Sequence, residues 1–128
     1  MNDAMKSKKV SSIVLVDDDE IFNFVNEKII RKYHAEAQIK SYLNPLEALE
    51  AIRIAPPDLI FLDINMPLMN GWEFLEAMDR HGIDCEVLIL SSSIDKKDIE
   101  KAESYSRVSG YISKPLTLDS LSKYIAPR

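Results

Sequence analysis

Residues 59–67 read Leu-Ile-Phe-Leu-Asp-Ile-Asn-Met-Pro, an apolar run that stops at an acid and opens into a loop. Four consecutive large apolar residues are typical of a short strand that is buried on both faces. Runs of the same kind occupy 13–16 (Ile-Val-Leu-Val) and 87–90 (Val-Leu-Ile-Leu). Shorter or more polar runs at 38–42 and 110–113 complete the set. The sequence therefore predicts five strands.

Segments with helical spacing separate these runs. We expect helices at 19–33, at 45 to about 54 (with Asn44 as N-cap), at 72–80, from Ser93 or Asp95 to about 105, and at 117–125. Strict alternation of strand and helix indicates an α/β fold with a parallel sheet and helices on both faces. Right-handed crossovers then favour a doubly wound, flavodoxin-like sheet of five strands in the order 2-1-3-4-5, with five helices.

Composition limits the functions that such a chain can have. The 128 residues fit one domain, which we expect at 12–128 after a flexible lead-in at 1–11. A net charge of −5 argues against direct nucleic-acid binding. The single cysteine, Cys85, allows no intrachain disulfide, and no apolar run approaches the roughly 18 residues that cross a bilayer. We therefore expect a cytoplasmic protein without membrane contact.

Polar side chains follow the predicted strands at the point where each strand ends. Asp17, Asp18 and Asp19 follow the first strand, and Asp63 follows the third. The fourth strand leads into Ser91 and the fifth into Lys114. Because parallel strands end at one edge of the sheet, near the point where the strand order reverses, we expect these side chains to converge.

The expected cluster suits phosphoryl transfer. Carboxylates placed within a few ångströms repel one another unless a cation joins them, and hard oxygen ligands favour Mg²⁺. An ammonium and a hydroxyl beside the metal would stabilise a transferred phosphoryl group, and a carboxylate can be the nucleophile. The alternative is that acids after a strand cap the next helix, and we assign that role to Asp19.

At these residues the chain resembles the receiver domain of two-component response regulators. The resemblance rests on Val16-Asp17-Asp18, on 62–67 (Leu-Asp-Ile-Asn-Met-Pro), on Leu90-Ser91-Ser92 and on 110–115 (Gly-Tyr-Ile-Ser-Lys-Pro), and it spans nearly the whole chain. It implies that Asp63 is phosphorylated by a histidine kinase or a histidine phosphotransfer protein.

The same resemblance implies roles for the remaining site residues. Asp17, Asp18, Asp63 and the backbone carbonyl of Asn65 would hold Mg²⁺. Ser91 and Lys114 would contact the phosphoryl group, and the Tyr111 ring would follow the movement of Ser91. The Lys114-Pro115 peptide bond is expected to be cis, which only about 5–6% of X-Pro bonds are.

The output of a stand-alone receiver is a change in protein contacts. We expect phosphorylation to shift a conformational equilibrium of the face made by the fourth helix, fifth strand and fifth helix. A homodimer, if one forms, would use the same face, which includes Lys96, Lys97, Glu100, Lys101, Ser104, Tyr111 and Leu118. The cognate kinase and the downstream partner cannot be read from the sequence.

Three alternatives stay open at this point. The chain can be a receiver domain cut from a larger regulator or hybrid kinase. Asp17-x-Asp19 also matches the motif of haloacid dehalogenase-type phosphatases, although Ile21 stands where those enzymes have Thr or Val. A flavodoxin-type FMN carrier shares the fold but not the acids after the first strand. Under the leading hypothesis the protein is not an enzyme and catalyses only its own phosphorylation and dephosphorylation.

Overall fold

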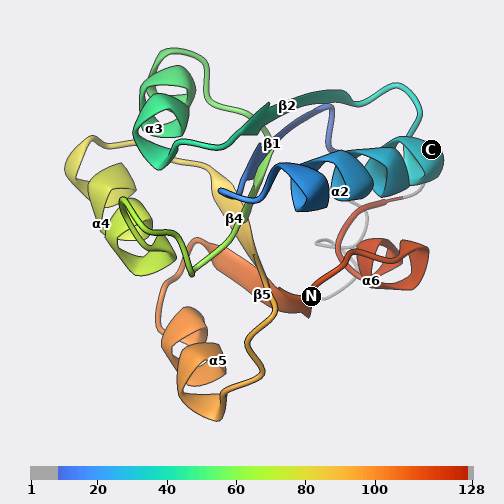
Figure 1. The fold of residues 1–128 in the computed structure, drawn as a ribbon. Coiled ribbons are helices and arrows are strands. Elements are labelled where there is room, and N and C mark those ends of the chain that lie inside the picture. Colours follow the sequence, from blue (N-terminus) through green and yellow to red (C-terminus); the bar gives the residue numbers. More distant parts are fainter. Residues whose placement is uncertain (1–8, 127–128) are drawn as a thin grey trace.

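Strands and helices alternate throughout residues 9–126, the part of the chain that the computed structural model describes (Figure 1). The strands are β1 (Ser12–Val16), β2 (Gln38–Tyr42), β3 (Leu59–Leu62), β4 (Glu86–Ser91) and β5 (Val108–Ser113). The helices are α2 (Glu20–Tyr33), α3 (Pro45–Ile54), α4 (Gly71–Arg80), α5 (Lys96–Glu103) and α6 (Leu118–Ser122).

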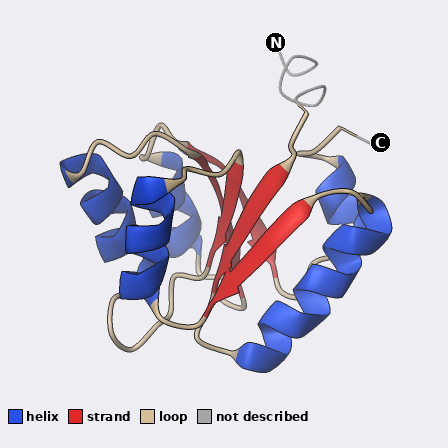
Figure 2. Ribbon diagram, turned by 90° about the horizontal axis from the view of Figure 1, so that it is seen from above, coloured by secondary structure: helices blue, strands red, loops and turns tan. Residues whose placement is uncertain are grey.

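The five strands form one parallel sheet in the order β2-β1-β3-β4-β5, as predicted. Helices α2 and α6 cover one face of the sheet, and α3, α4 and α5 cover the other (Figures 1 and 2). The doubly wound α/β architecture is therefore confirmed. None of the helices in the described part of the chain is long and apolar enough to cross a membrane.

Alternating side chains of the strands feed two separate cores. In β1, Val14 and Val16 belong to the cluster that also contains Phe74 of α4, on the side of α3, α4 and α5. Ile13 and Leu15 belong to the cluster on the side of α2 and α6. A continuous apolar run is needed because both faces of the strand are buried, and this explains the four-residue runs in the sequence.

Side-chain caps fix where the helices begin. Asp19 Oδ1 accepts hydrogen bonds from the backbone N–H groups of Ile21 and Phe22, so the capping role predicted for Asp19 is confirmed. Asn44 caps α3, with Pro45 in the first turn. Asn70 and Glu73 form a reciprocal capping box at the start of α4. Each of these capped helices begins in the segment that follows the end of a strand.

His34, the residue directly after α2, is buried although histidines at helix ends are commonly solvated: it is only 3% exposed. Its Nε2 lies 2.8 Å from the carbonyl oxygen of Val10 and must donate, because a carbonyl oxygen can only accept. Val10, within the predicted lead-in, packs in the core beside α2, whereas residues 1–8 of that lead-in lie outside the described residues.

Gly71 allows the chain to turn tightly beside Asp63. A Cβ at this position would lie 2.7 Å from the Cα of Ile64 and 2.9 Å from the carbonyl oxygen of Asp63. Both neighbours are backbone atoms, which cannot move without shifting the loop. We therefore expect Gly71→Ala to lower the free energy of unfolding by about 1–3 kcal/mol, measured by urea denaturation.

Gly82→Ala is the matched control for this substitution. Gly82 has a φ of +66° but an open surrounding, so alanine there meets backbone strain and no clash. The expected loss is about 1 kcal/mol. Because Gly71 has no positive φ, a Gly71→Ala variant as stable as the wild type would show that the contact with Asp63 and Ile64 costs nothing.

Candidate functional site

Strand register brings the predicted site residues to one edge of the sheet. Val16 of β1 pairs with Leu62 of β3, so Asp17 and Asp63 leave neighbouring strands at the same level. The backbone N–H of Asp63 donates to the carbonyl of Val16 at 3.0 Å and fixes this alignment. On the other side of β3, Ser91 pairs with Ser113, and the backbone N–H of Lys114 donates to the carbonyl of Ser91 at 3.0 Å.

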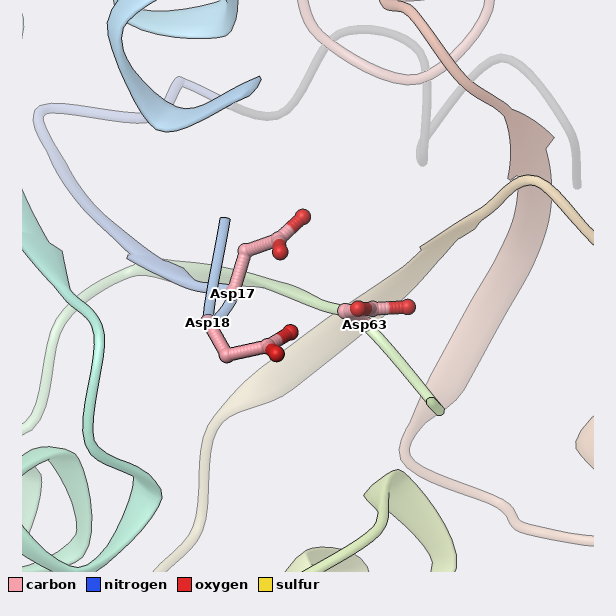
Figure 3. A group of neighbouring side chains, drawn as sticks. All are labelled: Asp17, Asp18 and Asp63. Atoms are coloured by element: carbon pink, nitrogen blue, oxygen red, sulfur yellow. The ribbon is translucent and has the colours of Figure 1, made fainter. Parts of the chain in front are cut away.

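Three carboxylates gather between the ends of β1 and β3, as Figure 3 shows for Asp17, Asp18 and Asp63. One oxygen of each lies within 4.8 Å of the other two. Asp17 and Asp63 are each 4% exposed, whereas Asp18 faces solvent. Asp17 Oδ1 accepts from the backbone N–H of Asp19 at 2.9 Å. The convergence expected from the sequence is therefore present in the structure.

Lys114 reaches into this cluster from the end of β5. Its Nζ lies 2.5 Å from Oδ2 of Asp17 and 3.4 Å from Oδ2 of Asp63, and its side chain is 6% exposed. The same Nζ stands 4.5 Å from the centre of the Phe22 ring, which contributes a cation–π contact. Burial works against the ammonium, but the hydrogen bond to Asp17 and the charge of Asp63 outweigh it and raise the pKa of Lys114.

Burial and a neighbouring charge perturb the carboxyl group of Asp63. Burial, followed by repulsion from Asp17, raises the pKa of Asp63 from 3.8 to about 6. The backbone N–H of Asn65, which donates to Oδ1 at 3.2 Å, and the Lys114 ammonium limit the rise. A cation bound among the three acids would favour the ionised form. A bound cation would therefore lower the pKa of Asp63.

The cluster fits a hard divalent cation by its own geometry. Three carboxylates from two neighbouring loops supply oxygen ligands, which Mg²⁺ prefers. Asp17 Oδ2 is buried and meets the Lys114 ammonium at 2.5 Å. A carboxylate oxygen has two lone pairs, so this contact leaves one for a metal ion.

Ser91 and Tyr111 meet at the loop that follows β4. Ser91 is fully buried, and its Oγ accepts from the backbone N–H of Ser93 at 3.0 Å. The half-buried Tyr111 donates its hydroxyl to the carbonyl of Ser93 at 2.9 Å. Both side chains that the resemblance connects to switching are thus tied to one residue of one loop. The Lys114-Pro115 bond is cis, as expected.

The only tryptophan of the chain lies in the seam between α4 and α5. Trp72 is half-buried, packs against the core on this side of the sheet, and stacks on Tyr105 with ring centres 5.9 Å apart. Lys101 of α5 places its Nζ 5.1 Å from the centre of the Trp72 ring. Trp72 is the second residue of α4, and the loop between Asp63 and Asn70 leads directly to that helix.

Helix α2 contributes three residues that the sequence did not single out as site residues. The Phe22 ring lies against the Lys114 ammonium. The Asn23 side chain donates a hydrogen bond to the carbonyl of Asp17. The Asn26 side chain accepts one from the backbone N–H of Leu116. Apolar spacing favours Val25 for the inward face of α2, but Val25 is 37% exposed, and the two asparagines are buried instead. The sequence signal for this burial is the spacing of Asn23 and Asn26, which lie three residues apart and so share one face of the helix.

Comparisons with known proteins agree with this geometry. The family model described as "Response regulator receiver domain" matches residues 13–126. A solved two component response regulator from Cytophaga hutchinsonii is 38% identical, with a TM-score of 0.82, over 89% of this chain and 92% of that one.

Two curated relatives are longer proteins. A probable C4-dicarboxylate response regulator, DctR, from Priestia megaterium is 26% identical over 91% of this chain, which spans 51% of that protein. A protein-glutamate methylesterase/protein-glutamine glutaminase from Treponema pallidum is 36% identical over 69% of the chain, which spans 22% of that protein. The chain thus spans about half or less of the length of these relatives.

Proposed function

Because this chain belongs to the family of response regulator receiver domains, we propose that Asp63 accepts a phosphoryl group from a histidine kinase or a histidine phosphotransfer protein. The observation that carries the proposal is the contact between a buried Asp63 and the buried ammonium of Lys114, beside two further acids. A carboxylate, a fixed cation and a set of metal ligands are the groups that phosphoryl transfer requires.

In the proposed reaction a carboxylate oxygen of Asp63 attacks the phosphorus atom. An O–P bond forms as the P–N bond of the phosphohistidine donor breaks, and the leaving imidazole nitrogen keeps the electron pair of that bond. Lys114 stays protonated and faces the charge on the phosphoryl oxygens. Because the pKa of Lys114 is raised, its positive charge is present throughout the neutral range.

A magnesium ion would be held by Asp17, Asp18, Asp63 and the backbone carbonyl of Asn65. When bound, the ion neutralises negative charge on the carboxylates and on the phosphoryl oxygens. Asp17 is held in place by the backbone N–H of Asp19, and Asp18 faces solvent, where a metal ion and its waters have room. The exposed side of the site is also the side from which a donor protein would approach.

Ser91 would respond to the new phosphoryl group. Its hydroxyl can donate to a phosphoryl oxygen while its Oγ still accepts from the backbone N–H of Ser93. The Tyr111 hydroxyl donates to the carbonyl of Ser93. A movement of this loop would reach the surface of α5, β5 and α6 through Tyr111. We therefore assign the downstream protein contact, and any homodimer, to that surface.

Two alternatives lose support in the structure. The phosphatase hypothesis needs Asp19 as a free acid, but its carboxylate caps α2. The flavin hypothesis gains no support from three acids at the end of β1 and β3, which would repel a phosphate of the cofactor. Because the chain spans about half of the DctR relative, a larger regulator around this domain remains compatible with the proposal.

Phosphoryl uptake by the wild-type protein tests the proposal. The chain is incubated with acetyl phosphate, a small phosphodonor, and Mg²⁺, and its intact mass is recorded over time. We expect the addition of one phosphoryl group per chain and no addition when EDTA replaces Mg²⁺. Uptake that does not depend on Mg²⁺ would contradict the role assigned to the acid cluster, and the absence of any uptake would contradict the proposed function.

A further inference from the structure

Helix α2 buries two asparagine side chains at the edge of the sheet that holds the site. Asn23 is 4% exposed and Asn26 is 1% exposed. Burying an amide without hydrogen bonds costs free energy, whereas an apolar residue there would cost none. Both side chains have specific backbone partners, and those partners belong to two different loops of the site.

Asn23 holds the loop that carries the acids. Its Nδ2 donates to the carbonyl oxygen of Asp17 at 3.0 Å in a buried hydrogen bond. From the opposite side, the backbone N–H of Asp17 donates to the carbonyl of Tyr42 at 3.1 Å. The backbone of Asp17 is therefore fixed by β2 on one side and by α2 on the other, which leaves its carboxylate little freedom.

Asn26 holds the loop that carries the lysine. Its Oδ1 accepts from the backbone N–H of Leu116 at 3.1 Å, a buried hydrogen bond between residues 90 positions apart. The backbone N–H of Lys114 is bound to the carbonyl of Ser91. The chain is thus held at Lys114 and again two residues later. Phe22, four residues before Asn26 on α2, lies against the ammonium itself.

We propose that Asn23 and Asn26 are positioning residues with separate effects, Asn23 on the metal-binding acids and Asn26 on the Lys114 ammonium. The inference rests on the proposed function of the site. Neither asparagine would touch the metal ion or the phosphoryl group. Each acts through one backbone hydrogen bond, and a misplacement of about 1 Å in such a site can cost 10²-fold in rate.

Two leucine variants test the separation, because leucine is close to asparagine in size and makes no hydrogen bond. Magnesium affinity is measured by isothermal titration calorimetry, and the rate of uptake from acetyl phosphate is measured by intact mass at saturating Mg²⁺. We expect Asn26→Leu to slow uptake about tenfold while the magnesium Kd stays within about twofold. We expect Asn23→Leu to raise the Kd about tenfold while the rate at saturating Mg²⁺ stays within about twofold.

Each variant is the control for the other, and thermal unfolding of the metal-free proteins checks that both fold. Asn26→Asp, which keeps an acceptor oxygen for the N–H of Leu116, is expected to recover most of the lost rate. If Asn26→Leu does not fold, Asn26→Ala removes the acceptor without adding apolar bulk and gives the same comparison.

The outcomes separate this inference from the proposed function. Affinity and rate that fall together in both variants would reduce the asparagines to general stabilisers and overturn the inference. Unchanged affinity and rate in both would overturn it as well. In either case, uptake by the wild type would leave the proposed function intact. A wild-type protein that takes up no phosphoryl group would overturn both.

Discussion

An Asp63→Asn variant is expected to take up no phosphoryl group from acetyl phosphate under conditions that label the wild type completely. An amide cannot form the acyl phosphate, and the other two acids of the cluster are placed differently: Asp17 contacts Lys114 at 2.5 Å, and Asp18 faces solvent. The measurement is intact mass, followed by peptide mapping of the labelled wild type. Label on Asp17 or Asp18 would contradict the assignment of the nucleophile.

The same variant is expected to be more stable than the wild type in the absence of metal. Because the pKa of Asp63 is raised from 3.8 to about 6, the folded protein binds this proton more tightly than the unfolded chain does. The resulting stabilisation is complete below about pH 4 and is lost as the pH rises through about 6. Ionised Asp63 therefore costs the wild type up to about 3 kcal/mol at pH 7.

Asparagine is neutral at every pH and avoids this cost. Urea denaturation should give equal free energies of unfolding for the two proteins near pH 4 and a higher value for Asp63→Asn at pH 7. Asp84→Asn is the matched control, because Asp84 is an exposed acid in the segment before β4. A variant less stable than the wild type at pH 7 would mean that the contact with Lys114 outweighs burial and the repulsion from Asp17.

Replacing Lys114 by methionine is expected to move two properties of the site in opposite directions. Methionine keeps the length of the side chain over the Phe22 ring but removes the ammonium. Loss of a fixed charge aimed at the transferred group typically costs 10²–10³ in rate, and we expect phosphoryl uptake to fall by about that factor. Magnesium affinity should rise, because the ammonium, 2.5 Å from Asp17, competes with the cation for the same carboxylates.

Lys101→Met is the matched control for this variant. Lys101 also holds its Nζ over an aromatic ring, that of Trp72, but it belongs to the exposed surface of α5. Neither the rate nor the magnesium affinity should change. If Lys114→Met bound magnesium more weakly, the competition between ammonium and metal would be refuted, and Lys114 would instead be needed to hold the acids in place.

The sequence predicted the sheet and the convergence of acids and lysine for a simple physical reason. Strands buried on both faces need unbroken apolar runs, and the residue after each run must lie at the edge of the sheet. Asp63 and Lys114 could therefore be placed together although they are far apart in the chain, and Asp19 could be assigned to capping because an acid in that position satisfies free N–H groups.

The sequence did not predict which residues of α2 face the site. Apolar periodicity placed Val25 on the inward side, whereas the structure buries Asn23 and Asn26 and leaves Val25 partly exposed. A buried amide cannot be distinguished from a solvated one until its partner is known, and the partner of Asn26 lies 90 positions away. The burial of His34 cannot be read from the sequence for the same reason, since Val10, 24 positions away, supplies its hydrogen bond.

The stack of Trp72 on Tyr105 gives this protein an intrinsic optical probe. A chain with one indole emits from one known place, and here that place is the beginning of α4, with a cationic side chain over the ring. Ring stacking and a nearby ammonium both alter indole emission. Ligand titrations and stopped-flow experiments can therefore follow the unmodified protein by its own fluorescence, without a dye or an engineered label.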